Sequence, residues 1–433
     1  MWIVRASSAS LGLPLAYVIN LLLIHVPGAY AYVVSGGAYS GMVPGGDYVA
    51  DGILLTAIGV ACFVVGVRVA VAGSRIKLGV MERLASFHDR RFLLFCLLGG
   101  WFLAFGLTPL RNVPTLGAAI VYGSAIWMLA VMIGLSHAVR SRRSSGVVLW
   151  MAALLVYPST VLLFGGFLSY GTAAMIIVGS FAVISLRSAF SAFLIILLVG
   201  YLGLSLFVEY FNSRAELRAV LWSGAGFEQR VDAVANAFSN FRFFSVDDPA
   251  HLDALAQRLN QNEFVGLAAD RLQHGDVEYL KGRSFFEGLI APVPRAIWPS
   301  KPVYGGSGSV VSDLTGLQLS ETTSWGVGNV MEFYINFGLW SLIAAFVALG
   351  YLIGWLDRRA ALSIASQHPS RALVYFLPAV ALIQPNGSLV ELTGGAFAAL
   401  LAAHGWRFAW REYNRMAGGR RQRVPAYRTH EHR

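Results

Sequence analysis

The chain has 433 residues, 56% of them hydrophobic and only 13% charged, and its formal net charge is +10. Because a soluble domain normally carries about 25% charged residues, this composition excludes an ordinary soluble protein and predicts an integral membrane protein with many spans. The basic residues concentrate in short loops and in the C-terminal tail, a distribution that argues against a nucleic-acid-binding protein, whose basic residues gather on one face.

Ten apolar runs follow one another along the chain. A helix that crosses a bilayer needs about 17–25 mostly apolar residues, and the runs that reach or approach this length are residues 13–34, 53–71, 92–108, 115–136, 147–165, 172–186, 188–208, 333–355, 372–385 and 389–404. The sixth and seventh runs adjoin, but one helix over both would extend about 55 Å, far beyond a hydrocarbon core of about 30 Å. The sequence therefore predicts an all-α, polytopic fold with about ten transmembrane helices.

These runs divide the chain into four parts. Residues 1–208 hold seven transmembrane helices, residues 209–332 a large polar loop, residues 333–405 three more helices and residues 406–433 a basic tail. Lys and Arg are enriched in the cytoplasmic loops of membrane proteins, and here they concentrate in the tail and after the second, fourth and eighth runs. We therefore expect both termini in the cytoplasm and the large loop on the outer, periplasmic side.

The large loop is expected to be folded. Apolar residues recur at helical spacing in residues 229–241 and again in residues 249–273. Both segments are predicted to be amphipathic helices that lie on the membrane surface or pack over the spans. The loop holds fifteen acidic and ten basic residues, so it is net acidic and gives no support to a nucleic-acid interface.

The most distinctive stretch is residues 282–302, which read GRSFFEGLIAPVPRAIWPSKP. Its four prolines exclude a long regular helix. The same stretch contains Arg283, Arg295 and Lys301, which form a candidate anion site, because guanidinium groups bind phosphate bidentately and Lys acts as a point charge. The alternative is that these cations are interface residues that extend toward lipid headgroups.

Further candidate residues lie where the chain meets the outer membrane edge. Glu332, Tyr334 and Asn336 can contact sugar hydroxyls, and Glu332 can act as a base; alternatively, Glu332 is an acidic residue at a helix start, favoured by the helix dipole. Glu391 is one of few ionisable residues at membrane depth, which makes it a functional candidate. Arg111 is either a second phosphate contact or an interfacial anchor.

The sequence offers no pattern for a metal or a cofactor. Both cysteines, Cys62 and Cys96, lie in apolar runs, and the histidines show no ligand spacing. The HExxH, Walker and GxSxG patterns are absent from the sequence. We therefore expect a function that needs neither a metal nor a cofactor.

Two runs of residues resemble the Wzy-type polymerases of O-antigen and exopolysaccharide repeat units. The first is YLKGRS at residues 279–284, followed by Pro-Arg, Ile-Trp-Pro and Lys-Pro at residues 294–302, and the segment Ala-Asp-Arg at residues 269–271 fits as well. The second is GNVMEFYINFG at residues 328–338. These runs cover about a sixth of the chain, and the order of spans with one large outer loop agrees with the family layout.

The resemblance implies a metal-independent glycosyltransferase with a helical, GT-C-like fold. Such an enzyme transfers a growing glycan on undecaprenyl diphosphate to another lipid-linked repeat unit at the periplasmic face of the bacterial inner membrane. Its implied partners are the lipid-linked donor and acceptor, membrane lipid, and a repeat-unit flippase and a chain-length regulator.

The resemblance also implies roles for particular residues. Arg295 and Arg283 would stabilise the negative charge of the diphosphate leaving group. Other cations would assist them: Lys301, Arg271, Lys281 and Arg111. Glu332 is the implied base, and Glu391 is the second candidate for this role. The remaining candidates would contact sugar rings or hydroxyl groups: Trp298, Tyr334 and Asn336.

Three other functions are compatible with the sequence. An O-antigen ligase uses the same chemistry, but the Pro-Arg, Trp-Pro and Lys-Pro run favours a polymerase. A transporter or flippase of an anionic or lipid-linked solute is the candidate from another class. Transporters tend to show internal repeats, broken helices and charges at mid-membrane; here no internal repeat is visible, the spans lack deep charges, and the polar residues concentrate in one outer loop. A structural assembly subunit is the third alternative.

Overall fold

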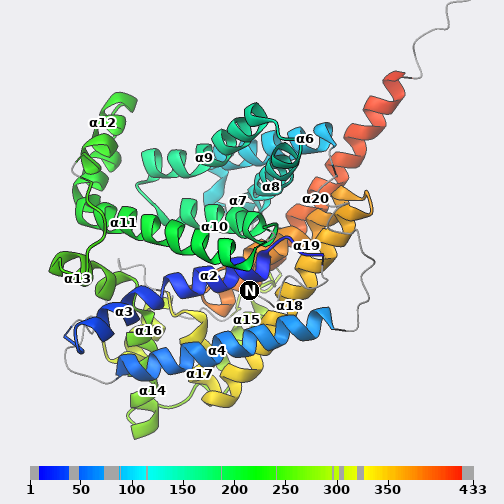
Figure 1. The fold of residues 1–433 in the computed structure, drawn as a ribbon. Coiled ribbons are helices and arrows are strands. Elements are labelled where there is room, and N and C mark those ends of the chain that lie inside the picture. Colours follow the sequence, from blue (N-terminus) through cyan, green and yellow to red (C-terminus); the bar gives the residue numbers. More distant parts are fainter. Residues whose placement is uncertain are drawn as a thin grey trace, which may run out of the picture.

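The computed structural model describes residues 9–38, 48–72, 87, 89–113, 116–186, 188–239, 241–294, 297–301, 307–318 and 326–421. Within these ranges the chain is helical throughout and forms no β-strand, which confirms the all-α prediction (Figure 1). The long helices gather into one bundle, and several shorter helices from the large loop pack against it.

The helices are listed here in chain order: α2 (Leu13–Leu23), α3 (Val26–Val34), α4 (Tyr48–Val71), α6 (Arg90–Trp101), a π-helix (Phe102–Gly106), a 3₁₀-helix (Thr108–Asn112), α7 (Leu116–Ser124), α8 (Ile126–Arg140), α9 (Ser144–Gly165), α10 (Ser169–Ile184), α11 (Ala189–Trp222), α12 (Phe227–Ala237), α13 (Pro249–Arg258), α14 (Gln261–His274), α15 (Arg283–Ile290), α16 (Ser307–Thr315), α17 (Asn329–Phe337), α18 (Leu339–Ala365), α19 (Pro369–Ala381) and α20 (Leu389–Arg421).

Seven helical segments within the described residues are long and apolar enough to cross a membrane, as expected for a polytopic membrane protein. They are Leu13–Val34, Tyr48–Val71, Leu116–Arg140, Ser144–Gly165, Ala189–Trp222, Leu339–Ala365 and Leu389–Ala417. Each overlaps one of the ten predicted spans.

The other three predicted spans form shorter helices. Residues 92–108 are divided between α6 and the π-helix, because the helical hydrogen-bond pattern changes at Phe102. Residues 172–186 form most of α10, and residues 372–385 contribute to α19, which starts at Pro369 and ends at Ala381.

Glycines let α4 and α18 approach each other closely, and the two helices lie side by side (Figure 1). Gly66 of α4 lies against the backbone of Val347, and Gly350 of α18 lies against the backbone of Phe63. Gly354, four residues further along α18, packs against Val67. Small residues at this spacing are typical of helix pairs in membranes, because they let the two backbones make close van der Waals contact.

We expect Gly66→Ala to destabilise the protein, because the new Cβ would overlap the backbone of Val347. Overpacking of this kind costs about 1–3 kcal/mol. Gly405→Ala in α20 is the matched control, since no described atom lies within 4 Å of the Cβ added there and alanine is the better helix former. Thermal unfolding in detergent should show a lower midpoint for Gly66→Ala alone. Equal midpoints for the two variants would contradict the close packing.

A tight turn at Gly338 separates α17 from α18, so the predicted span at residues 333–355 is broken near its start. Gly338 has φ 66° and ψ −142°, a conformation that favours glycine. The hydroxyl of Ser341 donates to the carbonyl of Phe333 at 2.6 Å, and the ring of Phe333 lies 5.0 Å from that of Phe346. Helix α17 therefore folds back along the first half of α18.

Helix α17 begins inside the bundle. Asn329 is fully buried there; its Oδ1 accepts from the hydroxyl of Tyr17 at 2.7 Å, and its Nδ2 donates to the carbonyl of Gly387 at 3.1 Å. Its backbone N–H donates to the carbonyl of Pro385 at 2.8 Å. The loop between α19 and α20 therefore provides hydrogen-bond acceptors for the start of α17.

The large loop also packs into the bundle. The sequence predicted one continuous helix over residues 249–273, and this prediction is wrong because the segment forms two helices. It divides into α13 and α14 near Leu259, whose carbonyl accepts from the N–H of Gly28, while the N–H of Gln261 donates to the carbonyl of Ile24 at 3.0 Å. The α2–α3 junction lies at these residues, so two helix breaks satisfy each other's backbone groups. Helix α14 then packs against α4, which agrees with packing over the spans.

Candidate functional site

The two motif runs, which are about fifty residues apart in sequence, are hydrogen-bonded to each other. The N–H of Leu280 donates to the carbonyl of Ile335 at 2.9 Å, and the N–H of Lys281 donates to the carbonyl of Asn336 at 3.1 Å. These carbonyls belong to the last turn of α17, where a helix has no internal donors left. Nδ2 of Asn336 in turn donates to the hydroxyl of Ser284 at 2.8 Å. The two motifs therefore form one structural unit.

Glu332 lies at the centre of this unit. It is on α17 and only 4% exposed, and its Oε2 accepts from the N–H of Leu389 at 2.6 Å, at the start of α20. It also forms a side-chain hydrogen bond with Ser284. The positive end of the α20 dipole therefore faces this carboxyl group.

Burial raises the pKa of Glu332 to about 8, although hydrogen bonds from Leu389 and Ser284 oppose the shift. The nearby carboxylates of Glu287 and Glu391 raise this pKa further, because a like charge disfavours ionisation. At neutral pH the group is therefore mainly protonated. Only the minor, ionised form of Glu332 can accept a proton. A pKa close to the working pH is typical of residues that act as acids or bases.

Arg283 lies at the edge of the same unit. It is the first residue of α15, after Gly282 at φ 88°, and its Nε donates to Oε1 of Glu287 at 2.9 Å. The Arg283 side chain is 60% exposed, whereas that of Glu287 is 10% exposed. Burial raises the pKa of Glu287, and Arg283 opposes that shift. The guanidinium group thus presents a positive charge at the surface of a cluster of buried carboxyl groups.

Helix α15 is packed onto the first turns of α20. The hydroxyl of Thr393 donates to the carbonyl of Gly288 at 2.5 Å, and Leu389 lies against the same glycine. Glu391 forms a capping box with Ser388: the Ser388 N–H donates to its Oε2 at 2.9 Å, and the Glu391 N–H donates to the Ser388 hydroxyl at 3.3 Å. Glu391 is therefore near Glu332 but already orders the start of α20.

Lys301 closes the C-terminal end of α15. Its Nζ donates to the carbonyls of Ala291 and Val293, each at 3.0 Å. A cation in this position satisfies carbonyls that the helix leaves without donors, so Lys301 is engaged by the backbone. Nearby, Nε1 of Trp298 donates to the hydroxyl of Ser300 at 3.1 Å. Arg295, the predicted central cation, lies outside the described residues.

Tyr334 and Lys281 differ in their exposure. Tyr334 is buried, and its hydroxyl accepts from Nε2 of Gln273 at 3.2 Å, so it connects α17 to α14. Lys281 is at the surface, in an ion pair of 2.9 Å with Glu278.

The remaining two predicted cations contact other parts of the chain. Nη1 of Arg271 approaches the carbonyl of Asp313 at 3.4 Å, beside Gly316. The guanidinium group of Arg111 donates to the carbonyl of Ala104 in the π-helix. The structure therefore brings Arg283, Glu332, Asn336 and Glu391 together, and it adds Glu287 and Ser284, which the sequence did not single out.

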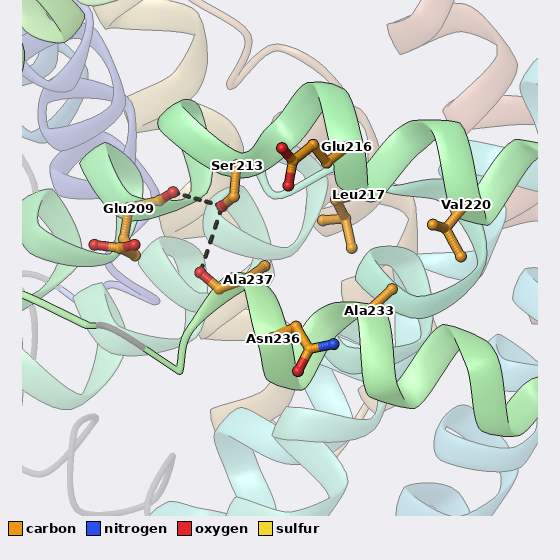
Figure 2. A pocket seen from close by; sticks show the side chains of 8 residues that line it. All are labelled: Glu209, Ser213, Glu216, Leu217, Val220, Ala233, Asn236 and Ala237. Carbon is orange, nitrogen blue, oxygen red and sulfur yellow. Dashed lines mark hydrogen bonds between the residues drawn. The ribbon is translucent and has the colours of Figure 1, made fainter.

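A separate pocket of about 340 Å³ lies between α11 and α12, at a distance along the chain from the motif unit (Figure 2). Figure 2 shows the polar side chains of Glu209, Ser213 and Glu216 on one face of α11, and the Ser213 hydroxyl donates to the carbonyls of Glu209 and Ala237. None of the predicted site residues that the structure describes lines this pocket.

Comparisons with known proteins found no relative of this chain. A scan of protein-family models, a search of curated proteins and a search of solved structures each returned no match. The resemblance to the polymerases therefore rests on the two motif runs, which the structure shows to be joined in space.

Proposed function

We propose that this protein is a glycosyltransferase that polymerises oligosaccharide repeat units carried on undecaprenyl diphosphate. The observation that carries the proposal is the joining of the two motif runs around Glu332, with the guanidinium group of Arg283 at the edge of the same cluster. A buried carboxyl group beside an exposed cation supplies the two functions that transfer from a lipid diphosphate needs: a proton acceptor and an anion-stabilising group.

The proposed reaction is a substitution at the anomeric carbon of the donor sugar. The acceptor hydroxyl oxygen forms the new bond to this carbon, while the bond from the carbon to the diphosphate oxygen breaks and its electron pair leaves with the diphosphate. Ionised Glu332 accepts the proton of the hydroxyl group. Arg283 and Arg295 stabilise the negative charge that develops on the diphosphate.

The proposal includes the ten-span, GT-C-like arrangement in the bacterial inner membrane, with residues 209–332 in the periplasm. One feature of the bundle supports this orientation. Arg68 on α4 and Arg358 on α18 lie at the same end of the helix pair, since Gly354 packs against Val67. A shared basic end is expected for a cytoplasmic boundary, which leaves Glu332 toward the opposite, outer end.

Lipid-linked glycans from a strain without this protein, resolved by mass spectrometry, test the proposal. We expect single repeat units on undecaprenyl diphosphate to accumulate and longer chains to disappear. Arg283→Ala should fail to restore the long chains, whereas Arg242→Ala should restore them, because Arg242 is an exposed cation of the same loop that pairs with Asp248. Long chains stranded on the lipid would instead indicate a ligase.

A transporter or flippase is the second candidate, and one observation favours it. Helix α17 is short, and its N-terminus lies inside the bundle beside the α19–α20 loop. Such discontinuous helices are typical of substrate sites in carriers. The same experiment separates the two functions, since an unchanged pool of lipid-linked glycans in the deletion strain would exclude the polymerase and the ligase and leave the transporter.

A further inference from the structure

Two arginines of the large loop meet around the ring of Phe211, and a third, Arg218, lies over the rings of Phe167 and Trp222 instead. On α11, Cζ of Arg214 lies 4.1 Å from the ring centroid of Phe211, and Cζ of Arg258, the last residue of α13, lies 5.9 Å from the same centroid. The two guanidinium groups are therefore within about 10 Å of each other. Arg218 follows Arg214 by one helical turn, so it lies on the same face of α11.

The position of this cluster along α11 corresponds to a headgroup layer. The apolar part of the helix, residues 189–208, is about 30 Å long, which matches a hydrocarbon core, and headgroups occupy roughly 5–7 Å beyond it. Helical side chains point back toward the N-terminus. Accordingly, Nη2 of Arg218 donates to the hydroxyl of Tyr210 at 3.0 Å, in the first turn after the apolar part.

The cluster carries positive charge that its surroundings only partly offset. Within the described part of the chain, neither Arg214 nor Arg218 forms an ion pair with a carboxylate. The acidic residues Glu209 and Glu216 of α11 face the pocket beside α12 instead, roughly on the opposite side of the helix (Figure 2). Burial lowers the pKa of Arg258, and the charges of Arg214 and Arg218 lower it further.

We propose that Arg214, Arg218 and Arg258 form a binding site for the phosphate group of an anionic phospholipid headgroup. Phe211 holds two of the guanidinium planes by cation–π contacts, and Arg218 is held by its bonds to Tyr210 and to the carbonyl of Gly166. Guanidinium N–H groups of Arg214 and Arg218 that these contacts leave unused can then bind one phosphate, and the positive charge of Arg258 adds to the attraction. The site does not depend on glycosyl transfer.

This arrangement differs from cations that extend separately into the interface. Separate cations keep their rotamer freedom and attract anionic lipids only by their net charge. Here the guanidinium groups of Arg214 and Arg258 come from two helices and share one ring, and that of Arg218 is fixed by its own ring and hydrogen-bond contacts, so all three are already ordered. Lipid bound between them would connect α11 and α13 at the membrane surface, next to the end of α9 that Arg218 contacts.

Native mass spectrometry of the purified full-length protein tests this site. The probes are phosphatidylglycerol, phosphatidylcholine with the same acyl chains, and inorganic phosphate. We expect wild-type protein to retain phosphatidylglycerol in preference to phosphatidylcholine, whose choline group offsets the phosphate charge. Arg214→Gln should weaken phosphatidylglycerol binding about tenfold, the loss expected when one charge-assisted hydrogen-bonding group is removed.

Arg242→Gln is the matched control, because it removes one exposed cation from the same loop and should retain wild-type binding. A thermal melt without added lipid checks that Arg214→Gln is folded. Equal phosphatidylglycerol binding by Arg214→Gln and wild type would overturn the proposal. Displacement of the lipid by millimolar inorganic phosphate would also overturn it, since the cluster would then be a site for free phosphate.

Discussion

Under the proposed polymerase function, replacing Glu332 with glutamine is expected to reduce polymerisation by about 10²–10⁴-fold, the usual contribution of a general base. Glutamine has nearly the same shape and keeps an oxygen that can accept from the Leu389 N–H, so the variant should fold and insert. The measurement is chain extension in vitro with purified protein and lipid-linked repeat units. Glu228→Gln on exposed α12 is the matched control, and it should be as active as wild type.

The pH dependence of the proposed polymerisation by the wild-type protein tests the role of Glu332 independently. Only ionised Glu332 accepts a proton, and its pKa is raised to about 8. The rate should therefore rise about tenfold per pH unit below this value and become constant above it. A rate that is independent of pH between 6 and 8, or an active Glu332→Gln enzyme, would exclude Glu332 as the base.

The free energy of unfolding should fall as the pH rises, whereas the rate should increase. Glu332 has an ordinary pKa of 4.5 when the chain is unfolded and a pKa of about 8 in the folded protein. Between these values the folded state binds more protons than the unfolded state, so the free energy of unfolding falls as the pH rises. The loss is on the order of 4 kcal/mol by pH 8.5, because the ionised carboxylate is then buried.

Glu332→Gln separates this effect from other titrating groups. The amide mimics the protonated carboxyl group, so the variant and wild type should unfold at similar temperatures near pH 5. Near pH 8.5 the variant should be the more stable of the two by several degrees, as measured by thermal unfolding in detergent. Parallel decreases for both proteins over this range would show that Glu332 does not ionise within a buried site.

Hydrophobic runs predicted the helical bundle well, because the length needed to cross a bilayer is a strong constraint on sequence. The turn at Gly338 was not predicted. Residues 333–337 run into the span that follows with neither a proline nor a charged residue between them, and only the backbone conformation of Gly338 shows that the chain reverses there. The continuous helix expected at residues 249–273 failed for a similar reason: its break is fixed by backbone contacts with Ile24 and Gly28.

The candidate site was predicted in part. The motif runs identified Arg283, Glu332 and Asn336, which the structure places in one cluster. Glu287 was missed, although its position four residues after Arg283 on a short helix was a usable signal for an ion pair. Lys301 shows the limit of residue type as a guide, because three nearby carbonyls engage the cation that the motif suggested for phosphate.

The arginine cluster at Phe211 was missed entirely. Arg214 and Arg258 are far apart in sequence and lie on different helices, and no short motif joins them. Their proximity depends on how α13 packs against α11, which is a tertiary contact that one sequence does not reveal.

The junction between α2 and α3 has a consequence for how this protein is made. Backbone groups of Ile24, His25 and Gly28 are paired with residues 259–262, more than 230 positions later in the chain. A ribosome adding about 5–20 residues per second needs roughly 12–46 s to synthesise that interval. During this time the first helix pair has an incomplete hydrogen-bond network, so it cannot reach its final packing until residues 259–262 have been synthesised and have folded back onto it.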